Sequence, residues 1–127
     1  MKSAISEVNK AIFTALSGLS FPVYDCIPEN SSFPYCDISE MTANDRSAKN
    51  LPGESFLLTA HFWSQYKGTK EVREMVDAFI QIITTTTLNM TGFNNHFSEI
   101  EYIGISNDPD GLTRHGTVKV RFYVTEA

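Results

Sequence analysis

The sequence predicts an α+β fold in which a mainly antiparallel sheet of four to five strands carries two helices on one face. The prediction depends on two amphipathic helical stretches, several alternating apolar segments, and the order helix, three strands, helix, two strands. This order lacks the regular strand-helix alternation that builds a parallel sheet. Two helices on one sheet face are the simplest packing that buries the apolar side of every element.

The N-terminal half supplies one helix and the first strands. Apolar residues recur every three or four positions over 5–19, which predicts a helix that Gly18 can end in a left-handed cap. Prolines bound an extended segment at 21–28, so we expect it at a sheet edge. Alternation predicts a strand over 35–40. The polar segment 42–53 predicts a mobile loop, because it contains one large apolar side chain and many turn formers.

The middle of the chain supplies the strongest strand and the second helix. Large apolar or aromatic side chains fall on both sides of the strand predicted over 54–64, so we expect both of its faces to be at least partly covered. Thr69 is placed to cap a helix whose apolar stripe runs through residues 72–83. The helix should fade at the four threonines 84–87, and an Asn-rich loop should follow as far as Asn95.

Two strands complete the predicted sheet. One begins at 98–102 and the other covers 118–124, with Lys119 and Arg121 on its polar side. The sequence Asp108-Pro109-Asp110-Gly111 between them predicts a turn, because Pro presets φ and Gly tolerates a positive value. Both aspartates are explained by that turn, in which short carboxylates accept backbone hydrogen bonds, rather than by acid-base catalysis.

Length, composition and charge restrict the class of protein. The 127 residues are 42% hydrophobic and 20% charged, with a net charge of −5, and we expect a single domain over 1–127 with one core. The excess of acids opposes non-specific binding to nucleic acid or anionic lipid. No apolar run approaches the ~20 residues of a membrane helix, and no export signal is visible. We therefore expect a cytoplasmic chain without membrane contact.

Residues that could carry chemistry are scattered. His61, His96 and His115 are expected on a strand, a loop and a hairpin tip, without metal-ligand spacing. The seven glycines are isolated, so no phosphate-binding loop is present. The sequence therefore predicts neither a metal nor another cofactor. Cys26 and Cys36, on consecutive predicted strands, are expected to be structural thiols, although a redox pair or a nucleophile stays open.

Trp63 and Tyr66, at the end of the central strand, allow two interpretations. They either close the core or anchor a protein partner, since buried aromatics dominate interface energetics. The residues alone therefore favour a binding or assembly protein over an enzyme.

Three parts of the chain resemble one family, the phage tail completion proteins, also called tail terminator or head-tail joining proteins. The similar segments are VYDCIPE at 23–29 with FPYCDI at 33–38, HFWSQYKGTKEV at 61–72, and NDPDGLTRHG at 107–116. The resemblance fades in 42–53 and 84–96. It implies a structural protein without catalysis that forms a ring, commonly a hexamer. Such a ring caps the tail tube and joins it to the head-completion protein, while DNA passes through without specific binding.

The resemblance also suggests a location and an interface. The protein would assemble in the host cytoplasm and end at the head-tail junction of the virion. The loop 42–53 would order on the tube or a neighbour, and Arg114 at the hairpin tip would pair with an acid of the adjacent subunit. The expected interface residues are Asp45, Arg46, Lys49, Trp63, Tyr66, Asp110, Arg114 and His115.

Two other functions remain open on the sequence. One is a small enzyme or thiol-dependent protein in which Cys36 or Cys26 acts with His61 on a neighbouring strand. The other is a regulatory module that dimerises through the sheet edge at 21–28.

Overall fold

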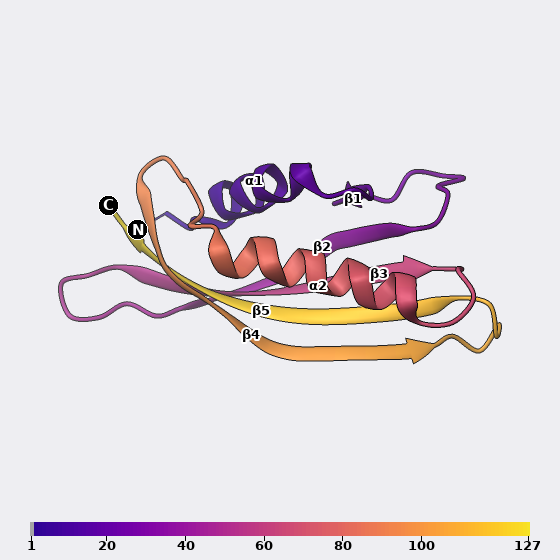
Figure 1. Cartoon of the computed structure of the whole chain (residues 1–127). Helices are drawn as coiled ribbons and strands as arrows, with labels where there is room; N and C mark the ends of the chain where they lie inside the picture. The colour runs from indigo at the N-terminus through magenta and orange to yellow at the C-terminus, as the bar shows by residue number, and fades with distance from the viewer. Residues whose placement is uncertain (1) are drawn as a thin grey trace.

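The computed structural model describes residues 2–127 as one five-stranded sheet with two α-helices. The strands lie in the order β1-β2-β3-β5-β4, and β1 is at one edge (Figure 1). β1 runs parallel to β2, whereas the other three neighbouring pairs are antiparallel. The predicted α+β fold and element order are confirmed, and the single parallel pair makes the sheet mixed.

The elements have the following bounds. They are α1 (Ile5–Ala15), a short 3-10 helix (Leu16–Gly18), β1 (Val23–Tyr24), β2 (Tyr35–Asp45), β3 (Gly53–Ser64), α2 (Lys70–Thr85), β4 (Phe93–Asn107) and β5 (Arg114–Glu126).

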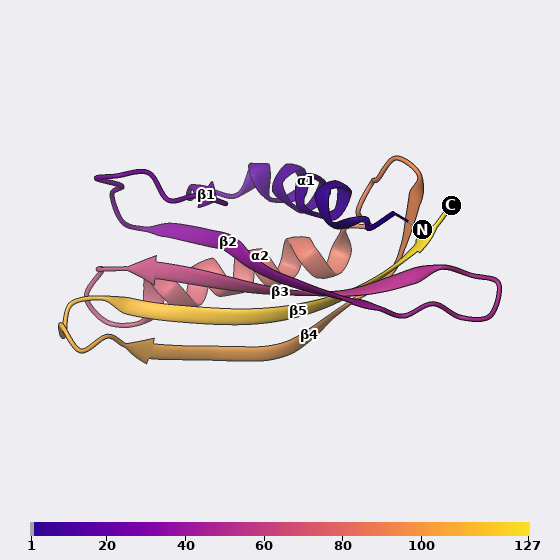
Figure 2. The same cartoon turned by 180° about the vertical axis from the view of Figure 1, so that it is seen from behind.

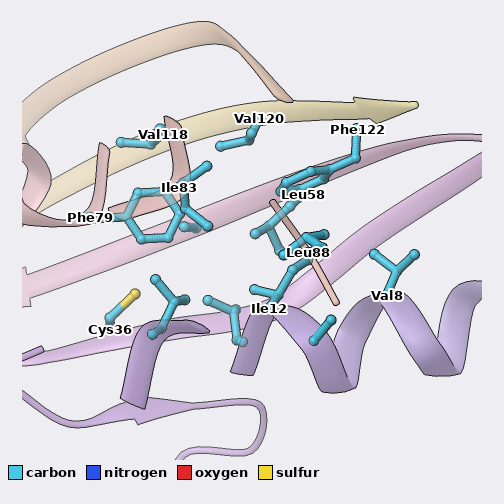
Figure 3. Close-up of a cluster of buried hydrophobic side chains, with 14 of the residues drawn as sticks. Val8, Ile12, Cys36, Leu58, Phe79, Ile83, Leu88, Val118, Val120 and Phe122 are labelled. Carbon is cyan, nitrogen blue, oxygen red and sulfur yellow. The ribbon is translucent and has the colours of Figure 1, made fainter. Parts of the chain in front are cut away.

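Both helices lie on the same face of the sheet, and the view from behind shows the opposite face without a helix (Figures 1 and 2). The core fills the space between the helices and the sheet, where Ile12, Phe79 and Phe122 are completely or almost completely buried (Figure 3). Burying a side chain of this size contributes about 1.5–3 kcal/mol. The helices therefore cover the sheet because their apolar stripes match its apolar face.

The first helix is shorter than the sequence predicts, and the prediction of a left-handed cap at Gly18 is wrong. α1 ends at Ala15, and the 3-10 helix that follows is closed by a 3.2 Å hydrogen bond from the Leu19 amide to the Leu16 carbonyl. Leu19 is extended, with φ −70° and ψ 151°. The chain thus leaves the helix directly toward Phe21, which is buried against the core, and needs no left-handed residue.

The predicted loop over 42–53 is also wrong for most of its length. β2 continues to Asp45 and pairs with β3 up to Asp45 opposite Glu54, so the connection is only residues 46–52. We call residues 42–56 the arm; its tip extends beyond the helices (Figure 1). The end of β2 is exposed on both faces, so no alternation of apolar residues marks it as a strand.

The second helix extends further than the sequence predicts. α2 runs through Thr85 because the hydroxyls of Thr84 and Thr85 donate to the carbonyls of Ile80 and Gln81 within the helix. Thr69 does precede the helix, but its side chain makes no capping hydrogen bond to the backbone.

The last two strands start earlier than predicted. β4 begins at Phe93, inside the expected Asn-rich loop, so His96 is in a strand. β5 begins at Arg114, so His115 is in a strand and not at a hairpin tip. The turn between the strands is as predicted, with Gly111 at φ +72°.

Candidate functional site

The sheet face opposite the helices carries aromatic, basic, hydroxyl and apolar side chains. We call it the open face; it includes Leu57, Thr59, His61 and Trp63 of β3 and His115, Thr117, Lys119, Arg121 and Tyr123 of β5. The expectation that this side of β3 is at least partly covered is confirmed, since Thr59 is only 5% exposed and Leu57, His61 and Trp63 are half-buried. Neighbouring side chains contribute to the cover, as where the His115 ring stacks on Trp63.

A histidine pair lies at one end of the open face. His61 Nδ1 is 2.8 Å from His115 Nε2, and His61 Nε2 is 3.1 Å from Glu40 Oε1. Trp63 stacks on His115 with ring centroids 4.0 Å apart and an angle of 4° between the planes. Burial, followed by the nearby charge of His61, lowers the pKa of His115, while Asp108 acts in the opposite direction.

The pair can hold only a limited number of protons. The two facing nitrogens share one hydrogen bond, so at most one of them carries a hydrogen. A charge on both rings would place two cations in contact and break that bond. From the sequence these histidines are expected to lie apart, and nothing in their spacing predicts a contact. Pairing β3 with β5 brings His61 and His115 together.

The arm is attached to the open face by its arginine. The Arg46 guanidinium lies over the Tyr123 ring at 4.9 Å and the Phe97 ring at 5.7 Å, and these two rings stack on each other. Each such cation–π contact contributes about 0.5–1 kcal/mol at an exposed site. Arg46 therefore fixes the direction of the arm relative to β4 and β5.

The tip of the arm is closed by a second set of contacts. Asp45 Oδ1 accepts hydrogen bonds from the Ser47 hydroxyl at 2.7 Å and the Ser47 amide at 3.1 Å, which lower the pKa of Asp45. The Gly53 amide donates to Ser47 Oγ. Lys49 is exposed at the tip. Of the three residues expected to contact a partner here, Asp45 and Arg46 also shape the arm itself.

The β4–β5 turn has its own internal hydrogen bonds. Asp110 accepts from the amides of Leu112 and Thr113, both at 2.8 Å, and from the Thr113 hydroxyl at 2.7 Å. These bonds lower the pKa of Asp110. Arg114 Nη1 donates to the Gly111 carbonyl at 3.2 Å. The predicted role of Asp110 in the turn is confirmed, and Leu112 beside it is 65% exposed.

Trp63 and Tyr66 occupy different environments. Trp63 is half-buried on the open face, and its Nε1 is enclosed without a hydrogen-bond partner among the described residues. Tyr66 is 60% exposed in the β3–α2 connection, next to a shallow depression that Phe33, Pro34 and Gln65 help to line. Tyr66 does not close the core, whereas Trp63 mainly packs on His115.

The cysteine arrangement does not support a thiol-dependent enzyme that uses Cys36 with His61. Cys36 is completely buried on the helix-covered face, opposite Phe62, whereas His61 points to the open face. Burial, followed by the negative charge of Asp37, raises the pKa of the Cys36 thiol, which disfavours the reactive thiolate. Cys26 is exposed and free in the segment after β1, not on a strand, so the two thiols form no disulfide.

No group of three or more His, Cys, Asp or Glu side chains among residues 2–127 is placed to hold a metal ion. None of the helices in this range is long and apolar enough to cross a membrane.

The predicted interface residues thus fall into separate places. Trp63 and His115 are in contact on the open face, Asp45, Arg46 and Lys49 are on the arm, and Asp110 and Arg114 are at the β4–β5 turn. Sequence reasoning missed Glu40, Phe97 and Tyr123, which complete the first two groups. Their partners are set by strand register, which short-range patterns do not contain.

Comparison with known proteins identifies the class of protein to which this chain belongs. The family described as "Tail completion protein gp17" matches residues 8–125. A curated relative of the same name, from Bacillus phage SPP1, is 26% identical over 98 residues, which cover 76% of this chain and 71% of the relative. The chain belongs to the tail completion protein gp17 family and is a phage virion structural protein.

A solved structure has the same fold. A chain from the "Virion of native gene transfer agent (GTA) particle" matches with a TM-score of 0.89 and 13% sequence identity, covering 98% of this chain and 99% of the other. Since so little of the sequence is shared, this likeness concerns the fold. The family resemblance seen in the sequence motifs is confirmed.

Proposed function

We propose that this chain forms a closed ring, a hexamer, that caps the finished tail tube and joins it to the head. The observation that carries the proposal is the match of residues 8–125 to a tail completion family. The chain acts by shape and surface contacts, and no catalytic step belongs to this function.

The surfaces described above provide separate contacts for such a subunit. The arm and the β4–β5 turn lie at opposite ends of the long strands (Figure 1). One end can therefore face the tail tube while the other faces the head.

The tip of the arm, 46–52, with exposed Lys49, becomes more protected from hydrogen exchange on assembly. Equal protection in the free and the assembled protein would contradict this part of the proposal.

DNA passes through the ring without being held. The net charge of −5 supports this part of the proposal, because acidic side chains around a channel repel the phosphate backbone. The ring assembles in the host cytoplasm and remains at the head-tail junction of the virion. A channel lined mainly by Lys and Arg in the assembled ring would contradict free passage of DNA.

The proposal is tested by producing particles without this chain. We expect tails of uncontrolled length or heads without attached tails in electron micrographs, and rescue when the wild-type chain is supplied separately. Normal particles with full infectivity in its absence would refute the proposed function.

A further inference from the structure

The outer edge of β4 has no strand beside it among residues 2–127. β4 is the last strand of the sheet, its partner strand is β5, and at its outer edge only Phe93 makes an isolated bridge, to Met90. Three of its apolar side chains are exposed, Tyr102 at 51%, Ile103 at 53% and Ile105 at 37%. Residues 102–107 contain no charged residue and no proline, the features with which proteins usually protect a sheet edge. This edge is therefore ready to accept another strand.

The opposite edge of the sheet is open over part of its length as well. β1 covers β2 only at Cys36 and Asp37. Beyond that point the outer edge of β2 has no strand beside it among the described residues, and the stretch 41–44 is uncharged. A second strand can pair over 41–44 without removing a charge from water, with Glu40 and Asp45 at the two ends of this stretch.

The two edges fit each other in direction. β2 is antiparallel to β3, β3 to β5, and β5 to β4, so β4 runs antiparallel to β2. If β4 of one copy lies beside β2 of the next, the pair is antiparallel and the helices of both copies stay on the same side of one continuous sheet. Charge is neutral to the fit, because Glu101 is paired with Arg121 of its own copy at 2.8 Å and the arm carries Asp45 and Glu54 as well as Arg46 and Lys49.

We propose that neighbouring copies of this chain join edge to edge, with β4 of one copy pairing with the outer edge of β2, over residues 40–45, of the next. This contact uses two different surfaces, and a repeated contact of that kind closes into a ring when the rotation per subunit permits. The inference rests on the proposed ring and specifies its joint. A symmetric pairing of β4 with β4 would instead produce a dimer and leave both β2 edges free.

Cysteine cross-linking tests the joint directly. Ile103 pairs with Val118 and Ala43 with Phe56, so both point to the helix-covered face and can meet across the joint. The full chain carries Ile103→Cys and Ala43→Cys together, with Cys26→Ser to remove the exposed thiol. Assembled tails are treated with a flexible thiol cross-linker that can still join the two cysteines if the strands pair one step out of register. We expect a ladder of covalent oligomers up to the complete ring.

The single variants are the matched controls. Ile103→Cys alone and Ala43→Cys alone should give no covalent oligomer, and dimers from Ile103→Cys alone would overturn the inference in favour of a symmetric pair. Rings visible at tail ends without cross-links in the double variant would overturn the joint but not the proposed function. Absence of rings at wild-type tail ends would refute the proposed function itself.

A charge variant provides a readout that does not depend on register. Ile103→Lys places a charge on the exposed edge without touching the core, so the melting temperature of the free chain should stay within about 2 °C of wild type. Ring assembly should be lost. The control Gln81→Lys, on the exposed side of α2, should assemble normally. Normal assembly of Ile103→Lys would overturn the inference.

Discussion

The two faces of the sheet are stabilised in different ways, although the same strands build both. On the helix-covered face, β3 contributes Phe56, Leu58 and Phe62, all completely buried in a continuous apolar core. On the open face, the same strand contributes His61 and Trp63, which are half-buried and held by individual contacts to β5. The covered face therefore depends on total burial, and the open face on specific pairs. Substitutions on the two faces should differ accordingly.

The largest effect is expected from Phe79→Ala on the covered side. Phe79 is completely buried and packs edge-on against Phe62, with ring centroids 5.2 Å apart. Its truncation should lower the free energy of unfolding by about 3–5 kcal/mol, because it removes buried apolar surface and leaves a cavity. Urea unfolding of the purified chain measures the change. Tyr66→Ala, at an exposed aromatic outside both faces, should cost less than about 1 kcal/mol, and equal losses would contradict the dependence of the covered face on burial.

A smaller effect is expected at Gly116 of β5, which α2 packs against. A Cβ at Gly116 would be 3.0 Å from Val76 Cγ2 and 3.1 Å from Val72 Cγ2. Gly116→Ala should therefore destabilise the chain by about 1–3 kcal/mol through overpacking. Gly18→Ala is the control, since nothing lies within 4 Å of its Cβ position. A neutral Gly116→Ala would show that α2 can move away without cost.

On the open face, the histidine pair should make stability depend on pH. The pKa of His115 is lower in the folded chain than its ordinary value, so the unfolded chain binds a proton more readily. The free energy of unfolding should therefore fall as the pH drops from about 6.5 toward the pKa of His115 in the folded chain. Above about pH 7 His115 is neutral in both states, so this destabilisation should be absent.

Two variants isolate this contribution. His115→Gln should weaken the dependence between about pH 7 and 5, measured by urea unfolding at each pH. His96→Gln, outside the pair, should retain it. An NMR titration that places the His115 pKa at or above the ordinary histidine value would contradict the sign.

The smallest effect on stability is expected at the β4–β5 turn. Arg114 makes one hydrogen bond to the Gly111 carbonyl, so Arg114→Glu should leave the melting temperature of the free chain nearly unchanged. If Arg114 pairs with an acid of the adjacent subunit, as expected from the sequence, tail completion should nevertheless be reduced. Scanning calorimetry and particle counts by electron microscopy separate the two effects, and an early-melting variant would make Arg114 a folding residue instead.

The same comparison explains how much could be predicted from the sequence. Alternation in residues 54–64 and the helical stripe in 72–83 predict the covered face, because burial leaves a periodic pattern. The end of β2 could not be predicted because it is mostly exposed and has no apolar pattern. The start of β4 could not be predicted because its half-buried side places Asn95 between Phe93 and Phe97, which breaks the apolar alternation. The contact of His61 with His115, which are 54 positions apart in sequence, depends on the register between β3 and β5. Local sequence patterns contain no information on that register.

The most direct test of the central claim is a cryo-electron microscopy map of the assembled particle with this chain located in it. We expect one closed ring of copies at the head-proximal end of the tail tube. Copies distributed along the tube, a position at the distal tip, or particles that lack the chain would contradict the claim.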